Sequence, residues 1–251
     1  MAVLPRVNMD MVLDEYNGVV IEPASIPNDR VLFLAELQRV MGFVAQEQKN
    51  IVWLTLPLSH AFLVDIATDM GFEFHNCLPQ QLTLIHRPSA ETFVPFVPTH
   101  TVGVGALIVR EGALLVVKER RSQGYKLPSG QVDLAESLAS AVRREVMEET
   151  GIETRFGSIV AISTKHPFQF GKSNIYVICQ LQALSEAIEV HDQHEIEEAC
   201  WVHHVDYLSD EKNPTFHRHL VERLISAQGL EWMEHPLKRG DDAQRELFFM
   251  R

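Results

Sequence analysis

The stretch that most constrains this chain is a predicted helix over residues 137–150, whose inward face changes character along its length. Gly151 follows it directly, in the position where glycine commonly ends a helix. At about 100° per residue, one stripe of this helix gathers these side chains: Leu138, Ala141, Val142, Glu145, Glu148, Glu149 and Ile152. A face that should bury apolar groups therefore begins apolar and ends in carboxylates.

Carboxylates gathered on an inward face repel one another and lose hydration, so they need compensating positive charge. Arginine supplies some of it, but magnesium or manganese is the better match, because hard cations take clustered acidic oxygens. The alternative is a solvated acidic helix end. Two features weigh against that alternative. The helix dipole disfavours anions near the C-terminal end, and a glycine-containing turn at residues 127–130 lets backbone approach a ligand.

Residues 130–152 resemble the Nudix box, a pattern of fixed acidic, basic and glycine positions. The box positions are filled by Gly130, Glu136, Arg144, Glu145, Glu148, Glu149 and Gly151, with Val146 and Ile152 at the aliphatic ones. The number of fixed positions makes chance agreement very unlikely. The resemblance implies a hydrolase that needs Mg²⁺ or Mn²⁺ and cleaves a diphosphate joined to another group.

The likeness extends beyond the box to one subgroup of the family. The stretches that carry it are residues 71–75, 99–105, 126–130 and 170–176. They are similar to those of plant ADP-ribose/NADH pyrophosphatases and of the vertebrate nucleoside diphosphate-linked moiety X motif 6 proteins. The resemblance implies an α/β (α+β) chain, in which a smaller acetyltransferase-like (GNAT-type) domain precedes a Nudix α/β/α sandwich. Asn174 stands where many relatives are expected to carry aspartate, which puts substrate contacts from its loop in question.

The metal ligands are expected among the box carboxylates. Glu149 is the strongest candidate, Glu145 lies one helical turn before it, and Glu148 is the third. The resemblance adds the backbone carbonyl of Ser129, the residue before the box glycine. Arg144 is expected to orient a box glutamate, and the alternative that it forms a salt bridge with Glu136 and has no catalytic role stays open.

The general base is expected in a later acidic loop, because Nudix enzymes often recruit a glutamate there. Residues 186–198 form that loop in the sequence, and Glu195 is favoured over Glu197 and Glu198. A solvated acidic loop is the alternative for most of these residues.

Contacts to the substrate are expected from basic and aromatic residues around the box. Lys126 and Arg120 could meet phosphate, and Phe170 or Phe168 could stack on a base. The plainer readings are solvated charges for the basic residues and core packing for the phenylalanines. A zinc site is disfavoured, because the spacing of His191, His194, Cys200, His203 and His204 matches no paired zinc motif.

The 251 residues suit one large domain or two small ones. Residues 87–98 contain three prolines and read as a linker. We therefore expect an N-terminal domain over 1–95, a Nudix domain over 96–230, and a tail over 231–251 whose docking place the sequence does not indicate. Outside the box, spacing predicts helices over 29–48, 57–70 and 214–227, and strands over 19–21, 51–56, 72–76, 81–86, 101–109, 113–118, 156–162, 174–181 and 199–202.

Composition narrows the class of protein. The net charge of −12 argues against a general nucleic-acid binder. The sequence contains no run of about 18 apolar residues, so no membrane span is predicted. The first residues do not have the pattern of a signal peptide. Three scattered cysteines fit a reducing cytoplasm rather than a disulfide framework.

The expected activity is hydrolysis of ADP-ribose or NADH by a metal-activated water, with the substrate implied only by the resemblance. Three alternatives stay open. One is a different nucleotide substrate, such as an oxidised nucleotide or coenzyme A. Another is a non-catalytic ligand sensor on the same fold, although sensors usually lose box glutamates. The third gives the N-terminal domain the main role, as a dimerisation or regulatory platform, and a homodimer is one expected form of the protein.

Overall fold

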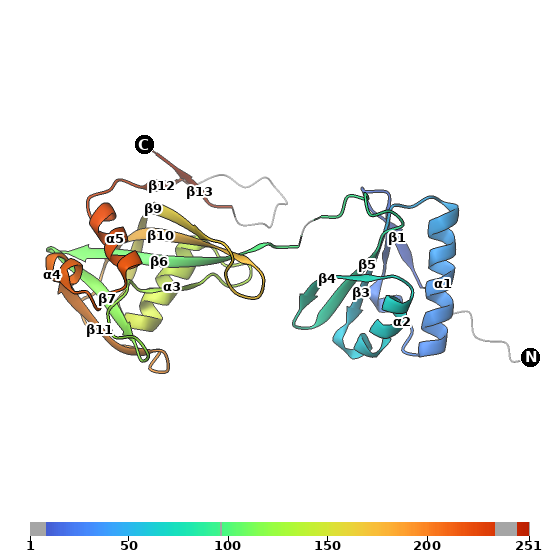
Figure 1. Ribbon diagram of the computed structural model, residues 1–251, viewed down its shortest axis with the longest axis horizontal. Coiled ribbons are helices and arrows are strands. Elements are labelled where there is room, and N and C mark those ends of the chain that lie inside the picture. Colours follow the sequence, from blue (N-terminus) through green and yellow to red (C-terminus); the bar gives the residue numbers. More distant parts are fainter. Residues whose placement is uncertain (1–8, 96, 234–244, 251) are drawn as a thin grey trace, which may run out of the picture. The chain divides into compact units, whose positions relative to one another are not determined.

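The computed structural model describes residues 9–95, 97–233 and 245–250, which fall into two compact units. The first unit comprises Met1–Val97 and the second Pro98–Arg251 (Figure 1). Residues 87–99, which contain the predicted linker, carry no helix or strand where they are described. No helix among the described residues is long and apolar enough to cross a membrane.

The N-terminal unit is a five-stranded sheet with helices, in the order β1-β2-β3-β5-β4. Its elements are β1 (Met11–Leu13), β2 (Gly18–Ile21), η1 (Pro23–Ser25), α1 (Arg30–Gln46), β3 (Ile51–Pro57), η2 (Leu58–Leu63), α2 (Val64–Asp69), β4 (Glu73–Leu78) and β5 (Gln81–His86). Strands β2 and β3 are parallel, and the other neighbours are antiparallel. Asp29 caps α1, since its side chain accepts from the amides of Val31 and Leu32.

The second predicted helix of this unit differs from the expectation in its first half. The segment Leu58–Leu63 is a 3₁₀ helix, and α-helical geometry begins only at Val64. No side chain caps the first turn after Pro57, and 3₁₀ turns are common at such helix starts.

The C-terminal unit contains an eight-stranded sheet with the order β11-β7-β6-β10-β9-β12-β13, and β8 pairs with β6 outside this path. Its elements are β6 (His100–Arg110), β7 (Ala113–Glu119), β8 (Ser129–Gln131), α3 (Leu138–Thr150), β9 (Thr154–Lys165), β10 (Ser173–Ala183), β11 (Ile196–His203), α4 (His204–Ser209), α5 (Thr215–Leu224), β12 (Leu230–Met233) and β13 (Leu247–Phe249). Strands β6 and β10 are parallel, with Tyr176 opposite Gly103.

Helices pack on both faces of this sheet, and the alternation of side chains along β6 explains why (Figure 1). Val104, Ala106 and Ile108 share one apolar core with α3. Leu107 belongs to a second core, which it shares with α4 and α5. Both units therefore confirm the predicted mixed α/β class.

The box helix begins and ends as its sequence predicts. The Ser137 side chain accepts from the amide of Ser140, and Gly151 ends the helix with a φ of 70°. A second cap comes from far along the chain: the Glu246 carboxylate accepts from the amides of Leu138 at 2.7 Å and Ala139 at 3.2 Å. Strand β13 beside Glu246 pairs with β12, so the described part of the tail docks against the start of α3.

Two elements near the predicted acidic loop depart from the expectation. The loop ends at Glu195, because β11 begins at Ile196 and pairs antiparallel with β7. Glu197 and Glu198 therefore lie in a strand. The short helix α4 follows without a gap, and six residues are too few to show a helical period in the sequence.

Candidate active site

The turn before the box brings backbone to the buried end of α3. Strand β8 opens at Ser129, and its amide donates to Glu149 Oε2 at 2.8 Å. Glu149 itself is only 4% exposed. Burial is the main cause that raises the pKa of this carboxyl to about 8, although Lys126 and the Ser129 amide oppose the rise. Helix α3 thus holds the Glu149 carboxyl in apolar surroundings, in contact with the glycine-containing turn.

Glu145 lies on the same turn from the other side. A Cβ added to Gly130 would stand 2.1 Å from its carboxyl carbon, so only glycine leaves room for that group against the backbone. Burial is also the main cause that raises the pKa of Glu145, with Arg144 opposing. The predicted inward stripe is therefore correct for Glu145 and Glu149.

Glu148 occupies the rim rather than the interior. Its side chain is 48% exposed, and its carboxylate lies 3.2 Å from Arg144 Nη1. The position follows from the helix geometry, because Glu148 lies toward the edge of the stripe on which Glu145 and Glu149 are inward.

Arg144 ties the glutamates together and to the turn. Its guanidinium pairs with Glu136 at 2.8 Å, Glu145 at 2.9 Å and Glu148 at 3.2 Å, and it also donates to the carbonyl of Gln131 at 3.0 Å. The bonds from Arg144 lower the pKa of Glu136. This one side chain contacts three box glutamates and the backbone of β8, so it does more than form an isolated salt bridge with Glu136.

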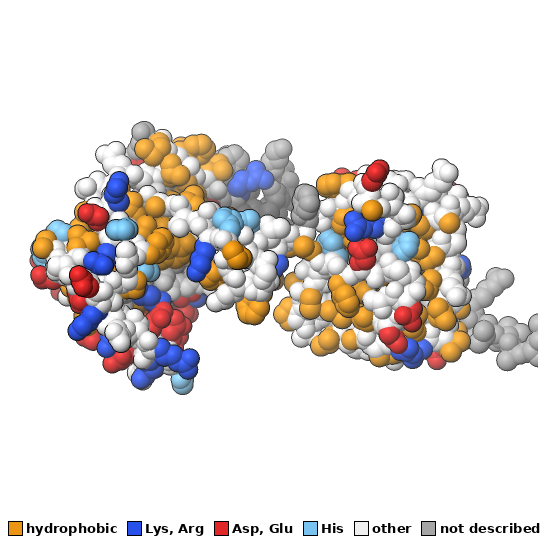
Figure 2. All heavy atoms as spheres, viewed as in Figure 1, with side chains coloured by type: hydrophobic (Ala, Val, Ile, Leu, Met, Phe, Trp, Pro, Cys, Tyr) orange, Lys and Arg blue, Asp and Glu red, His pale blue; other side chains and the backbone are white. Residues whose placement is uncertain are grey.

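Lys126 is the other cation of the site. Its ammonium lies 3.7 Å from Glu149 and 4.0 Å from Glu195, and it contacts Glu119 closely. Burial lowers its pKa, but Glu149 and Glu119 outweigh that effect and the pKa is raised. Figure 2 shows acidic and basic side chains side by side at the end of this unit where β7 and β11 lie.

Glu195 joins the box residues, whereas its two neighbours do not. It lines a cavity of about 390 Å³ together with Ser129, Gly130 and Glu145, and its side chain is 57% exposed. Glu197 pairs instead with Lys118 at 3.3 Å, and Glu198 accepts from the Tyr125 hydroxyl at 2.9 Å. Of the three glutamates, Glu195 is the one that reaches the carboxylates of α3.

Arg120 and Phe170 are not among the residues that line this cavity. Arg120 Nε donates to the carbonyl of Gln193 at 2.7 Å, and its amide donates to the carbonyl of Glu195 at 3.0 Å. It therefore braces the loop that carries Glu195. Phe170 is 94% exposed in a turn with a φ of 54°. Phe168, the other phenylalanine of that loop, lines the cavity.

The donor chemistry suits a hard divalent cation, although the carboxylates are not drawn together around one point. Among the described residues, no group of three or more His, Cys, Asp or Glu side chains is arranged to hold a metal ion. The reason is visible in the contacts, since Arg144 holds Glu145 and Glu148 while Lys126 and the Ser129 amide hold Glu149. The buried Glu149 carboxyl and the half-buried Glu145 carboxyl are oxygen ligands of the type that Mg²⁺ and Mn²⁺ take.

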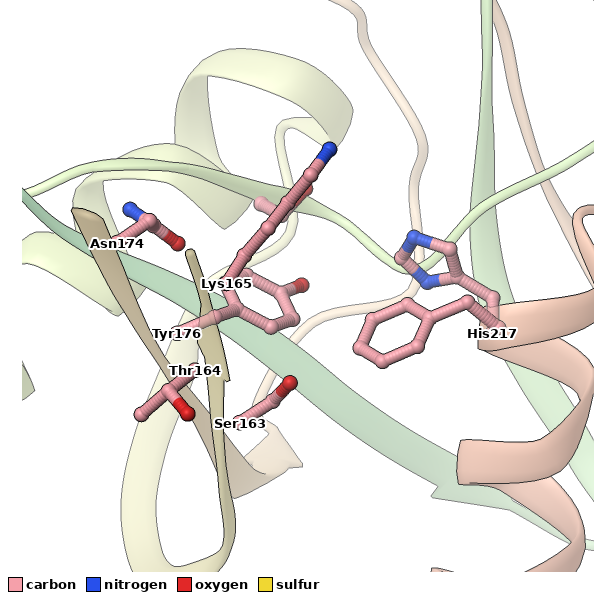
Figure 3. Close-up of a pocket in the computed structure, with 8 residues that line it drawn as sticks. Ser163, Thr164, Lys165, Asn174, Tyr176 and His217 are labelled. Carbon is pink, nitrogen blue, oxygen red and sulfur yellow. The ribbon is translucent and has the colours of Figure 1, made fainter. Parts of the chain in front are cut away.

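A second cavity, of about 540 Å³, adjoins the first (Figure 3). Ser129, Asn174 and Tyr176 line both cavities. The second one is completed by the end of β9 and by Phe216 and His217 of α5. The amide group of Asn174 donates to Thr101 Oγ1 at 2.9 Å. Sequence reasoning missed Tyr176 and His217, because α5 lies far along the chain from β10 and neither residue belongs to a motif.

Two family models match the chain. One, described as the NUDIX domain, matches residues 99–224, and the other, described as the Nudix hydrolase domain, matches residues 9–87.

Individual proteins are similar over most of the chain. Nudix hydrolase 10 of Arabidopsis thaliana is 37% identical over 198 residues, which are 78% of this chain and 71% of that protein. Nucleoside diphosphate-linked moiety X motif 6 of Homo sapiens is 30% identical over 187 residues, which are 70% of this chain and 59% of that protein. Among solved structures, the MutT NUDIX hydrolase from Burkholderia pseudomallei is 27% identical and covers 51% of this chain and 99% of its own, with a TM-score of 0.44.

Proposed function

Because the chain belongs to the Nudix family of hydrolases, we propose that it cleaves the diphosphate of a nucleoside diphosphate-linked metabolite, ADP-ribose or NADH. The observation that carries the reaction class is the Glu149 carboxyl, 4% exposed and bonded to the Ser129 amide beside Gly130. The substrate choice is supported by the resemblance of residues 71–75, 99–105 and 170–176 to the ADP-ribose/NADH pyrophosphatase subgroup. The expected products are AMP with ribose 5-phosphate or with reduced nicotinamide mononucleotide.

We assign the metal-holding role to Glu145, Glu149 and the carbonyl of Ser129, with Glu148 at the rim. Divalent metal ions, when bound, neutralise charge on the diphosphate and make water a better nucleophile. Arg144 keeps Glu145 and Glu148 oriented toward the turn through its 2.9 Å and 3.2 Å contacts. The buried carboxyl of Glu149 and the half-buried carboxyl of Glu145 need cations nearby, which supports this assignment.

Lys126 and Glu195 complete the proposed chemistry. Lys126, whose ammonium lies 3.7 Å from Glu149, would pair with substrate phosphates held beside that carboxyl. Glu195 accepts the proton of the attacking water. It lines the same cavity as Glu145, and its exposed side chain can reach a water there.

A substrate panel tests the proposal. Full-length protein is incubated with Mg²⁺ and separately with ADP-ribose, NADH, coenzyme A and an oxidised nucleoside triphosphate, and products are identified by chromatography. We expect AMP from ADP-ribose or NADH, and no product when a chelator replaces Mg²⁺. Turnover of only coenzyme A or the oxidised nucleotide would select the second candidate, and turnover of none would favour the sensor alternative.

Two glutamine variants, one at Glu195 and one at Glu198, test the assignment of Glu195 as the general base. Glu195→Gln should lower kcat by about 10²- to 10⁴-fold, the usual contribution of a general base. Glu198→Gln changes a neighbouring glutamate that bonds Tyr125 outside the cavity, and its kcat should stay close to the original. Equal losses in both variants would remove Glu195 from this role.

Three further expectations are retained as proposals. The N-terminal unit has an acetyltransferase-like fold without acetyl transfer, because the chain has no glycine-rich pyrophosphate loop before a helix in residues 1–90. The protein works in the cytoplasm. It forms a homodimer through the N-terminal unit, which light scattering of the full chain and of residues 96–251 would test.

A further inference from the structure

The loop that carries Glu195 is fastened to the end of the box helix. The backbone amides of His191 and Asp192 both donate to the carbonyl of Glu148, at 3.0 Å and 2.8 Å. That carbonyl belongs to the last turn of α3, where carbonyl groups have no partner within the helix. The loop therefore supplies donors that the helix end needs, and it starts from a fixed point beside Glu148.

Asp192 is the residue on which the turn between this point and β11 is built. One oxygen of its side chain, Oδ1, accepts from the amides of His194 at 3.1 Å and Glu195 at 3.2 Å. Its own carbonyl accepts from the amide of Ile196 at 3.0 Å, and Ile196 is the buried first residue of β11. Aspartate side chains commonly hold turns in this way, because they bond amides a few residues ahead. A single aspartate thus joins the helix end to the strand.

The backbone of Glu195 is held on both sides. Its amide donates to Asp192, and its carbonyl accepts from the amide of Arg120 at 3.0 Å. The Arg120 side chain adds a bond to the carbonyl of Gln193 at 2.7 Å. The Glu195 side chain, by contrast, is 57% exposed, and the ammonium of Lys126 lies 4.0 Å from its carboxylate. The backbone contacts, rather than contacts of the carboxylate, therefore determine where this glutamate lies.

We propose that Asp192 is a positioning residue, which holds Glu195 at the cavity without itself touching the substrate. The inference rests on the proposed function, since it concerns how the general base of that reaction is placed. Asp192 is not among the residues that line the cavity, so its side chain can affect the reaction only through the turn that it holds. Displacing a reacting group by about 1 Å can cost about 10²-fold in rate. An exposed, flexible side chain on a loop therefore depends on a fixed backbone to reach its water.

Three variants of the full chain separate positioning from a general loss of stability, with the substrate that the panel selects. Asp192→Ala removes both side-chain bonds and should lower kcat about 10- to 100-fold with KM unchanged. Asp192→Asn keeps an acceptor oxygen in the place of Oδ1 and should restore kcat. Asp29→Ala is the matched control, because one oxygen of Asp29 also accepts from two amides, those of Val31 and Leu32 in the other unit. It should lower the melting temperature and leave kcat unchanged.

A double variant decides whether Asp192 and Glu195 act as one unit. If Asp192 acts through Glu195, then Asp192→Ala combined with Glu195→Gln should be no slower than Glu195→Gln alone. Losses that multiply would show a separate role for Asp192 and overturn the inference. An unchanged kcat in Asp192→Ala would overturn it as well.

Hydrogen exchange and crystallography test the placement of Glu195 without turnover. Exchange at the amides of His194 and Glu195 should rise in Asp192→Ala and not in Asp192→Asn. A crystal structure of Asp192→Ala should show the Glu195 carboxylate moved away from Lys126. A carboxylate that stays 4.0 Å from that ammonium overturns the inference, whether or not any substrate is cleaved. If the carboxylate moves as expected while the substrate panel stays silent, only the proposed function is rejected.

Discussion

The helices α1 and α3 make the same kind of contact with their sheets but bury different chemistry. The inward side chains of α1 are all apolar: Phe33, Leu37, Val40 and Val44. Those of α3 begin with Ala141, Val142 and Val146 and end with Glu149 and Thr150. The same contrast holds between the units. Every residue classed as buried and polar among the described ones lies in the C-terminal unit.

The contrast between the two inward faces distinguishes residues that stabilise the fold from a residue that does not. A buried carboxyl gives a helix less stabilisation than an apolar side chain of similar size. Packing alone therefore explains the inward face of α1, whereas the buried carboxyl of α3 fits the metal-holding role proposed above. Substitutions in the two helices should consequently be felt in different measurements.

The largest effect is expected at the buried carboxyl. Glu149→Gln should lower kcat by about 10³-fold, because the metal loses a charged ligand. The melting temperature of the metal-free protein should not fall, since a neutral amide replaces a carboxyl that burial disfavours as an anion. Glu153→Gln, an exposed glutamate just past the same helix, should change neither. Loss of stability without loss of turnover would place α3 in the same class as α1.

A core truncation in α1 should show the opposite pattern. Phe33 is fully buried, and Phe33→Ala should cost the N-terminal unit about 3–5 kcal/mol of unfolding free energy. Below its unfolding temperature, kcat should be retained. Val31→Ala changes a side chain of the same helix that is 67% exposed. It should lower the free energy of unfolding by about 0.5 kcal/mol or less. Chemical denaturation followed by tryptophan fluorescence gives both values.

Replacing a glycine beside α3 and a glycine in α1 tests the same contrast between the two helices, with smaller expected effects. Gly130→Ala places a methyl group on the Glu145 carboxyl and should weaken Mn²⁺ binding about 10- to 100-fold, the usual cost of disturbing the support of a ligand. Gly42→Ala in α1 meets no atom within 4 Å and should stabilise its helix by about 0.5–1 kcal/mol. Electron paramagnetic resonance of Mn²⁺ measures the first and thermal unfolding the second. Unaltered Mn²⁺ affinity in Gly130→Ala would show that Glu145 does not hold the metal.

The smallest effect concerns how each helix begins. Asp29 caps α1 from the adjacent position, but α3 takes part of its cap from Glu246. Glu246→Ala should cost about 1 kcal/mol and should raise hydrogen exchange at Leu138 and Ala139. Glu222→Ala, an exposed glutamate on α5, serves as the control. Unchanged exchange at the two amides would remove Glu246 from the cap.

Local patterns predicted the box helix, its termination at Gly151 and the inward direction of the Glu145 and Glu149 side chains. Helical periodicity and capping depend on residues only a few positions apart, so the sequence shows them directly. The choice of Glu195 rests on the family resemblance rather than on a local pattern. The exposure of Phe170 could not be predicted, since a phenylalanine in a turn gives no sign of which way it points. Tyr176 and His217 meet only through tertiary packing of α5 against the sheet, and no spacing in the sequence signals that contact.

The cap from Glu246 also has a consequence for the order in which the protein forms. The glutamate and the amides that it binds are separated by 108 and 107 positions. During synthesis, the C-terminal unit can collapse around its apolar strands well before residue 246 leaves the ribosome. The first turn of the helix that carries the carboxylates is then completed only after the core on which that helix packs.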